Sequence, residues 1–291
     1  MLQHSQRLTL HNEIHARPPE ALSAPLALTH IVMWCDAAQR AASWNHIAML
    51  ARDHHLPPPD AACTHVRMDL GLYRVRWELH TEFVSWTFSR AIHAEGFGER
   101  EPDTASAAVP QSWLSELPGQ CLTNLHLWVL PNQAFGSGSL VKHVLNEDTL
   151  VASTVADGYA EVYTDFAVHG DGASRMVLLV GSMAPRRLGR LVQNLLEIET
   201  YRMAALLGLP AARDASAVLA SAERELAELA GAIRSATRES EPELLDRLTR
   251  LAGQVESQHA ATHSRFSASA AYFELVDKRI GDIAESRLAG M

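Results

Sequence analysis

The chain has 291 residues, of which 47% are hydrophobic and 20% charged, and its formal net charge is −9. This acidic balance argues against a nucleic-acid-binding protein, which needs a basic surface. The start of the chain lacks the apolar core of a secretory signal, no apolar run approaches the roughly 18 residues of a membrane span, and the three cysteines are far apart, so a reducing cytoplasm is expected.

The first part of the chain predicts one strand, one helix and a group of further strands. The expected elements are a buried strand over 26–34, a helix over 36–55 that ends before Pro57, and strands over 65–69, 73–83 and 84–90. The alternation of apolar residues changes parity after Phe83, which indicates a bulge or a tight bend there.

The next part repeats this order of elements. The expected elements are a strand over 122–130, a helix over 140–145, and strands over 149–156, 159–168 and 175–180. Asp157-Gly158 is a strong signal for a hairpin turn. Residues 78–83 and 161–166 share the pattern E-x-aromatic-T-acid-F, and the leading strands each carry a histidine, His30 and His126. We therefore expect an α+β domain over 1–183, made of an N-terminal arm and two tandem ferredoxin-like halves with antiparallel sheets, over about 20–93 and 118–183.

The last part, 184–291, is predicted to be helical. An amphipathic helix over 183–207 is expected to end at Gly208 and Pro210. Apolar residues then recur at spacings of three and four, over 219–236 and again over 244–283. This pattern predicts a long, coiled-coil-like antiparallel helical hairpin, through which the protein could form a homodimer.

The strand that begins at Arg74 holds the clearest candidate site. Because side chains alternate along a strand, one face carries a polar row made of Arg74, Arg76, Glu78, His80 and Glu82. This row either lines a cleft or forms a solvated sheet face with cross-strand ion pairs.

The N-terminal arm is a second candidate. His11 and His15 are four residues apart with Glu13 between them, but Asn12 stands where a zincin needs glutamate, so these two histidines do not predict a zinc site. His15 and Arg17 either reach a carboxylate elsewhere or belong to an arm that only caps the sheet.

The helix over 183–207 has an acidic residue, Glu199, within its apolar stripe, and Arg202 lies three residues further on. One interpretation is a buried Glu199–Arg202 pair that anchors the helix. The other is that Glu199 faces the polar row and completes a site with His80 and Glu82, suited to a divalent metal or to acid–base chemistry.

Five motifs in chain order resemble those of one bacterial family. They are N-E-x-H-A-R-P at 12–18, R-W-E-x-H-T-E-F at 76–83, L-P-G at 117–119, T-D-F at 164–166 and L-L-E-I-E-T-Y-R-M at 195–203. The chain thereby resembles domain-of-unknown-function family 3422, uncharacterised proteins described as membrane-anchored. The resemblance implies association with the cytoplasmic face of the inner membrane through a region that follows this chain. The chain itself would then be either a natural short form or a soluble piece. It implies no reaction.

Together these features predict a cytoplasm-facing, membrane-associated module that binds a small ligand or a partner. The expected ligand-binding residues are Glu13, His15, Arg17, Arg76, Glu78, His80, Glu82, Asp165, Glu199 and Arg202. Arg17 and Arg76 would bind an anionic group. The alternative is an enzyme that uses the histidine and carboxylates of the polar row, in which His80, Glu82 and His15 would hold a divalent metal. Haem on a histidine is a weaker alternative that rests on fold analogy alone.

Overall fold

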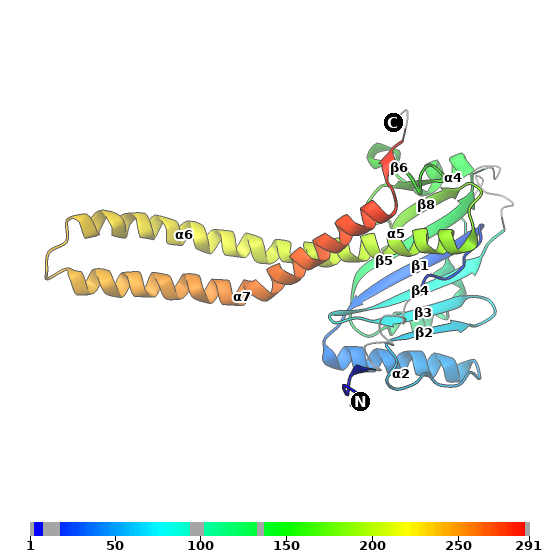
Figure 1. The fold of residues 1–291 in the computed structure, drawn as a ribbon, viewed down its shortest axis with the longest axis horizontal. Coiled ribbons are helices and arrows are strands. Elements are labelled where there is room, and N and C mark those ends of the chain that lie inside the picture. The colour runs from blue at the N-terminus through cyan, green and yellow to red at the C-terminus, as the bar shows by residue number, and fades with distance from the viewer. Residues whose placement is uncertain (1–2, 8–17, 94–101, 133–136, 289–291) are drawn as a thin grey trace. The chain divides into compact units, whose positions relative to one another are not determined.

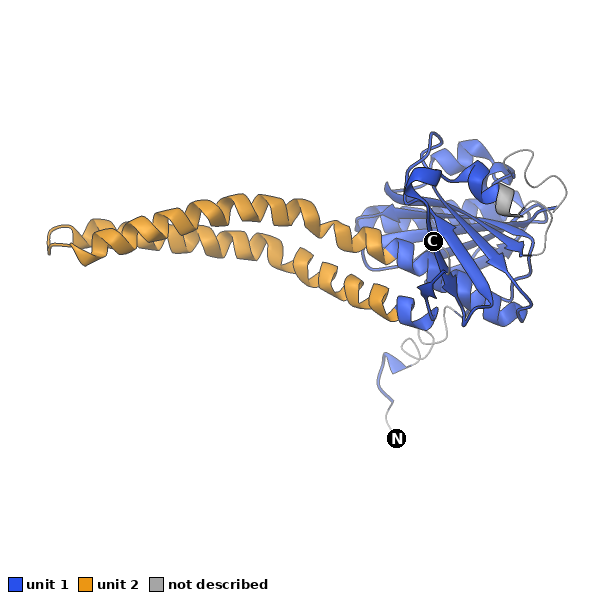
Figure 2. Ribbon diagram, turned by 90° about the horizontal axis from the view of Figure 1, so that it is seen from above, with its two compact units in different colours: residues 1–200, 279–291 blue, residues 201–278 orange. Residues whose placement is uncertain are grey.

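The structure is a computed structural model that describes residues 3–7, 18–93, 102–132 and 137–288 (Figure 1). It divides into two compact units, residues 1–200 with 279–291, and residues 201–278 (Figure 2). The sequence places the boundary earlier, between residues 183 and 184. The difference arises because Leu188, Leu191 and Leu195 pack into the same core as the sheet, which ties most of their helix to the first unit.

The first unit is built on one sheet. Its strands are β1 (Leu26–Trp34), β2 (His65–Asp69), β3 (Arg74–Leu79), β4 (Phe83–Ala91), β5 (Gln120–Pro131), β6 (Val151–Val155), β7 (Ala160–Thr164), β8 (Ser174–Val180) and β9 (Ser286–Arg287). They lie in the order β2-β3-β4-β1-β5-β8-β7-β6-β9. Neighbours are antiparallel except β5 and β8, which are parallel. The sheet is therefore mixed and continuous, not a pair of antiparallel sheets as the sequence suggested.

The two sequence halves meet at the centre of this sheet, where β1 pairs with β5. Within each half, the first strand lies beside the last, and the two middle strands follow outward. The directions differ, however, because β1 and β4 are antiparallel whereas β5 and β8 are parallel. The halves thus share their neighbour order but not their full topology, and a ferredoxin-like character is not confirmed.

Helices cover both faces of the sheet. These elements are α2 (Ala37–Asp53), η1 (Ala105–Ala108), α3 (Gln111–Ser115), α4 (Ser137–Val144), η2 (Glu147–Thr149) and α5 (Pro185–Leu206). A capping box between Asp36 and Gln39 starts α2. Helices α2 and α4 pack on a core that includes Trp77, Trp86 and Trp128, whereas α5 packs on the opposite face (Figure 1).

Two turns follow from the sequence. Strand β3 ends at Leu79 and β4 begins at Phe83, with the His80 amide donating to the Phe83 carbonyl at 2.9 Å, so the change of parity is a tight hairpin. His80 and Glu82 consequently lie in the turn and not in the strand. The predicted turn at Asp157-Gly158 is confirmed, because β6 pairs with β7 around it and both residues have a positive φ.

The second unit is a helical hairpin of α6 (Gly208–Arg234) and most of α7 (Glu241–Asp282). Gly208 does not end the helical path as predicted, because Leu207 is itself helical and Pro210 falls in the first turn of α6, where proline is tolerated. Gly208 instead allows close packing, since a Cβ there would lie 2.6 Å from the Ser269 Oγ.

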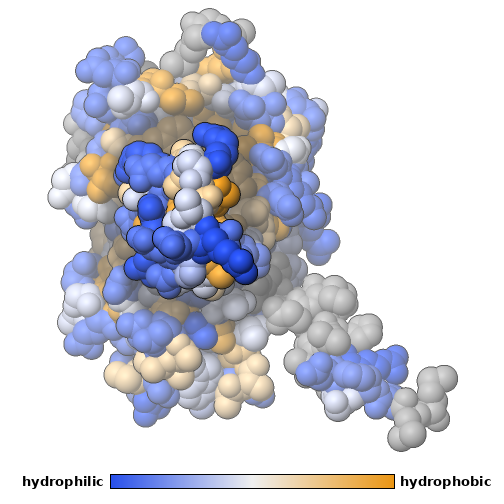
Figure 3. Space-filling view, turned by 90° about the vertical axis from the view of Figure 1, so that its left-hand side faces the viewer, coloured by the Kyte–Doolittle hydropathy of each residue, from blue (hydrophilic) through white to orange (hydrophobic). Residues whose placement is uncertain are grey.

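The hairpin buries only part of the predicted apolar seam. Ala222 and Leu229 of α6 pack with Leu251 of α7. In contrast, Leu219, Leu226 and Ile233 remain 43%, 51% and 51% exposed. The loop end of the hairpin is predominantly hydrophilic (Figure 3).

One helical stretch meets the length and composition of a membrane span. Within Pro185–Arg234, an 18-residue window has a mean hydropathy of 1.3, and 22% of that window is buried. Core helices of soluble proteins meet the same criterion, so this stretch alone does not assign the protein to a membrane.

Candidate functional site

The candidate site lies on the sheet face that α5 covers. The alternation of β3 sends Val75 and Trp77 into the aromatic core on one face. Arg76 and Glu78 therefore lie on the other face. His30 of β1 lies near them, because Thr87 of β4 pairs with His30 on one side and with Arg76 on the other. A polar cluster thus forms between the sheet and α5, made of residues from β1, β3, β4 and the helix.

His30 is held by two hydroxyl groups. Its Nδ1 lies 2.8 Å from Thr87 Oγ1 of β4, and its Nε2 lies 2.9 Å from Thr200 Oγ1 of α5. Thr200 donates its own proton to the Leu196 carbonyl at 2.8 Å. Thr200 must therefore accept from His30 Nε2–H, which leaves Nδ1 to accept from Thr87. The network assigns the Nε2–H tautomer.

The buried position keeps His30 neutral. Burial lowers its pKa to about 3, and the positive charge of Arg76 acts in the same direction, while Glu78 opposes it. With both ring nitrogens engaged and a pKa far below neutrality, His30 is suited to holding Thr87 and Thr200 in place. It is not suited to accepting a proton from a substrate at neutral pH.

Arg76 and Glu78 form a buried ion pair beside this histidine. Arg76 Nη2 lies 2.7 Å from Glu78 Oε2, and the two side chains are 12% and 6% exposed. Ser85 Oγ also approaches Glu78 Oε2, at 3.3 Å, and His80 Nε2, at 3.5 Å. Arg76 Nε is buried without a hydrogen-bond partner among the residues that the structure describes. Such a donor is costly to bury unless a group outside this set satisfies it.

The chain that precedes β1 closes the cluster. Arg67 of β2 pairs with the Glu20 carboxylate at 3.0 Å and donates to the Pro18 carbonyl. The Glu20 carbonyl lies against α5 at Gly189, where a Cβ would be 1.5 Å from its oxygen. Glycine at this position is therefore what lets residues 18–25 run close to the helix.

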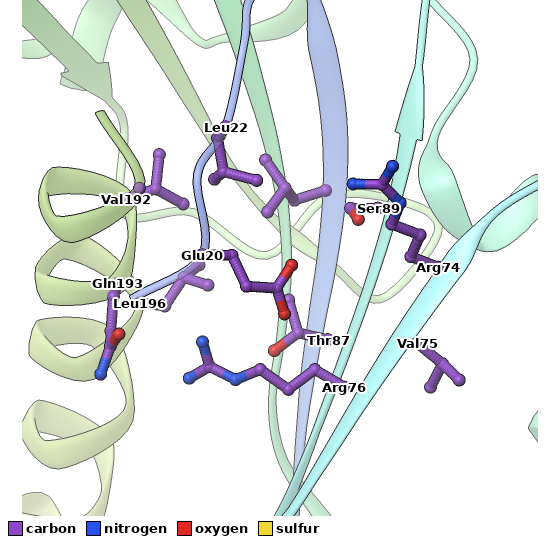
Figure 4. Close-up of a pocket in the computed structure, with 12 residues that line it drawn as sticks. Glu20, Leu22, Arg74, Val75, Arg76, Thr87, Ser89, Val192, Gln193 and Leu196 are labelled. Carbon is purple, nitrogen blue, oxygen red and sulfur yellow. The ribbon is translucent and has the colours of Figure 1, made fainter. Parts of the chain in front are cut away.

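A small pocket lies within the cluster. Its volume is about 30 Å³, and its walls include Glu20, Arg76, Thr87 and Gln193. Figure 4 shows Arg76 extending from β3 toward the helix that carries Gln193, with the Glu20 side chain beside it. Gln193 donates to Glu197 Oε1 at 2.8 Å, but its own Oε1 is buried without a partner in the described part of the chain. Two residues of the pocket wall therefore carry one unsatisfied donor and one unsatisfied acceptor within the described part of the chain.

A larger pocket adjoins the small one. It has a volume of about 410 Å³ and shares the side chains Leu22, Arg74 and Ser89 with the small pocket. Pockets of this size accommodate small molecules. Arg74 pairs with Asp69 at 3.0 Å, and Arg90, which also lines the larger pocket, approaches Asp103 at 3.6 Å. The larger pocket is thus polar, with its arginines already balanced by carboxylates.

The structure brings some of the predicted site residues together. Arg76 pairs with Glu78, and Ser85 lies between Glu78 and His80, while Glu82 lies in the same turn as His80. His80 stacks on Phe83 with ring centroids 4.2 Å apart. Glu13, His15 and Arg17 lie outside the described residues.

Other predicted residues make contacts with further parts of the structure. Glu199 accepts a hydrogen bond from Thr123 at 3.3 Å, and Arg202 lies past the boundary of the first unit. Asp165 accepts from the Asn146 and Ala167 amides at 2.8 and 3.0 Å, and lies 2.9 Å from His169 Nε2. Asp165 therefore organises the loop after β7.

No group of three or more His, Cys, Asp or Glu side chains in the described ranges is arranged to hold a metal ion. Of the metal-binding set predicted from the sequence, His80 and Glu82 are among the described residues and His15 is not.

Sequence reasoning missed His30, Thr87, Thr200 and Gln193. The available signal was a histidine within an otherwise apolar strand, which was interpreted only as a mark of repetition. Its counterpart His126 is also buried, with Nδ1 3.0 Å from Thr29 Oγ1 and a pKa that burial lowers to about 4. Thr29 pairs with His126 across β1 and β5. Because Thr29 directly precedes His30 in β1, Thr29 and His126 lie on the opposite face of the sheet from His30.

Comparison with known proteins gives a family but no activity. Neither a curated protein nor a solved structure matches the chain. A family model described as a protein of unknown function does match, over residues 2–291, and this range includes all five motifs identified in the sequence. The chain therefore belongs to the DUF3422 family of proteins of unknown function.

Proposed function

We propose that this protein is a binding module. Its site is the small pocket between β3 and α5 that Arg76 and Gln193 line, here called the Arg76 pocket. The observation that carries the proposal is that Arg76 of β3 and Gln193 of α5 line one pocket, and that each has a buried atom without a partner among the described residues, Nε and Oε1. A ligand group that both accepts and donates a hydrogen bond would satisfy both atoms at once.

The surroundings favour a neutral polar group over an anion. Arg76 already has a carboxylate partner in Glu78, and Glu20 adds a second carboxylate to the pocket wall. A ligand anion would be repelled by these two groups. A hydroxyl or primary amide fits better, and the volume of about 30 Å³ has room for a group of about the size of water. The rest of the ligand, or of a partner's side chain, would occupy the larger pocket.

A screen of small alcohols and amides by thermal shift, followed by calorimetry, tests this proposal. Gln193→Met removes the acceptor at similar volume, and Arg76→Lys keeps the charge for Glu78 but removes Nε. Each variant is expected to weaken binding by about tenfold, the equivalent of one hydrogen bond. Gln120→Met, at an exposed position on β5, is the matched control.

The free protein gives a second measurement that does not need a ligand. Gln193→Met removes a buried, unsatisfied oxygen but also the bond to Glu197, so the free energy of unfolding should change by less than about 1 kcal/mol. Binding that is equally strong in wild type, Gln193→Met and Arg76→Lys would contradict the proposal. A screen in which no alcohol or amide binds would contradict it as well.

Association with the cytoplasmic face of the inner membrane is a further part of the proposal. It is supported by the resemblance that the five sequence motifs carry. Fractionation of cells that express the protein tests it. Recovery in the membrane fraction after a carbonate wash is expected, and recovery only in the soluble fraction would contradict it.

We also propose that a second copy of the chain covers the exposed row on α6. Leu219, Leu226 and Ile233 repeat every seven residues, which is the spacing of a helix–helix seam. Leu226→Lys should convert a dimer to a monomer in light scattering, whereas Ser221→Lys, on the other side of α6, should leave it dimeric. A wild-type protein that is monomeric at high concentration would refute this assembly.

A further inference from the structure

A third pocket lies beside the first turns of α5. Its volume is about 480 Å³, and α5 contributes Arg187, Arg190, Leu191 and Asn194 to its wall. These residues are spaced by three and four, so they share one face of the helix. The Arg76 pocket instead uses helix positions 189, 192, 193 and 196. One helix therefore carries two distinct pockets on two of its faces.

Positive charge is in excess in this third pocket. Arg186, Arg187 and Arg190 line it, together with Asp157 and Asp282. Both carboxylates are already paired. Arg187 Nη2 lies 2.7 Å from Asp157 Oδ2, and Arg279, outside the pocket wall, reaches Asp282 Oδ2 at 2.9 Å.

Two of the arginines are left for a ligand. Arg186 and Arg190 are exposed, and neither has an ion pair or a side-chain hydrogen bond within the described ranges. The first turn of α5 contains no acidic residue. Cations at the start of a helix are unfavourable because the macrodipole is positive there. A bound anion would relieve this repulsion.

A buried amide provides a second, independent indication of a ligand. Asn194 is only 7% exposed and lines the pocket. Its side chain makes no hydrogen bond to any described residue. The N–H groups of this amide are suitable donors to an oxyanion that enters the pocket.

We propose that this pocket binds the phosphate group of a phosphate ester. Phosphate oxygens match the planar donors of Arg186 and Arg190 and can accept a further bond from the Asn194 amide. A volume of about 480 Å³ exceeds what the phosphate group needs and leaves room for the body of a small molecule. A soluble phosphate ester and a lipid headgroup present the same chemistry to these residues, and the experiment separates the two sources.

Two probes test the site on the whole chain. Calorimetry with inorganic pyrophosphate at low salt measures the binding of a free phosphate group. Co-sedimentation with phosphatidylglycerol–phosphatidylcholine vesicles, compared with phosphatidylcholine alone, measures the binding of a lipid phosphate. The variants are Arg190→Gln, Arg186→Gln/Arg190→Gln and Asn194→Asp, the last of which preserves shape but adds negative charge. Arg52→Gln is the control, because Arg52 is an exposed arginine on α2, which packs against the other face of the sheet.

One-to-one binding of pyrophosphate that weakens about tenfold in Arg190→Gln, and further in the double variant, would support the site with a soluble ligand. Binding only to the anionic vesicles, with the same losses, would support the site with a lipid headgroup. Should Asn194→Asp fail to fold, the two exposed arginine positions still decide the outcome. The proposal is overturned if neither probe binds, or if Arg52→Gln weakens binding as much as Arg190→Gln does.

Discussion

Replacing His30 with asparagine should remove a pH-dependent part of the free energy of unfolding. In the folded protein the pKa of His30 is lowered to about 3, whereas the ordinary value is 6.5. Between these values the unfolded chain binds a proton that the folded protein does not. The contribution of neutral His30 is therefore complete above the ordinary pKa and is lost as the pH falls toward the folded pKa.

The expected magnitude follows from the two pKa values. At about pH 5 the unfolded histidine is almost fully protonated and the folded one is not, so the wild type should lose about 2 kcal/mol relative to about pH 7.5. His126, with a pKa lowered to about 4, adds a similar loss in both proteins. The difference between wild type and His30→Asn cancels this shared part and isolates His30.

Urea unfolding followed by tryptophan fluorescence measures this difference, since the chain has six tryptophans. His30→Asn should be less stable than wild type at about pH 7.5, and the gap should narrow by about 2 kcal/mol at about pH 5. His93→Asn, at an exposed position, controls for the loss of a histidine as such. A gap of the same size at both pH values would refute the neutral, buried state of His30.

Three further changes test other parts of the structure. Gly189→Ala should lower the free energy of unfolding of the first unit by about 3 kcal/mol or more, because its Cβ would meet the Glu20 carbonyl. Gly231→Ala on α6, where a Cβ would meet only the Arg234 side chain at 4.0 Å, should raise that of the second unit by about 0.5–1 kcal/mol, and urea unfolding measures both. Asp165→Ala should lower the free energy of unfolding by about 2–4 kcal/mol in the same assay, since three hydrogen bonds are lost. A decrease below about 1 kcal/mol would contradict the role of Asp165 in organising the loop after β7. Burial raises the pKa of Cys35 to about 11, so iodoacetamide at about pH 8 should leave it unmodified in mass spectra of peptides from the native protein.

The local elements of the fold were accessible from the sequence. The run of apolar residues defined β1, and Asp157-Gly158 defined the turn between β6 and β7. The change of parity after Phe83 indicated the β3–β4 hairpin. These features depend on the residues of one segment and its neighbours, so periodicity and turn chemistry suffice to find them.

The joining of the halves and the full site depend on contacts between distant segments. Nothing in the sequence of β5 indicates that it pairs with β1 on one side and runs parallel to β8 on the other. Arg76 and Glu78 were predicted because they alternate within one strand. Thr200 was missed because it contacts His30 across 170 residues of chain, and a single threonine in a helix carries no signal for such a contact.

The contact between His30 and Thr200 makes the register of α5 selective. A helix with an apolar face can shift its register on an apolar sheet at a modest cost in free energy, because one leucine can take the packing position of another. One turn in either direction from Thr200, the helix offers Leu196 or Ala204, and neither side chain has a hydroxyl. A displaced helix would leave His30 Nε2–H without its acceptor, at a cost of about 1–3 kcal/mol. The hydrogen bond from His30 thus favours one register of α5 on the sheet. Both pockets that the helix lines depend on that register.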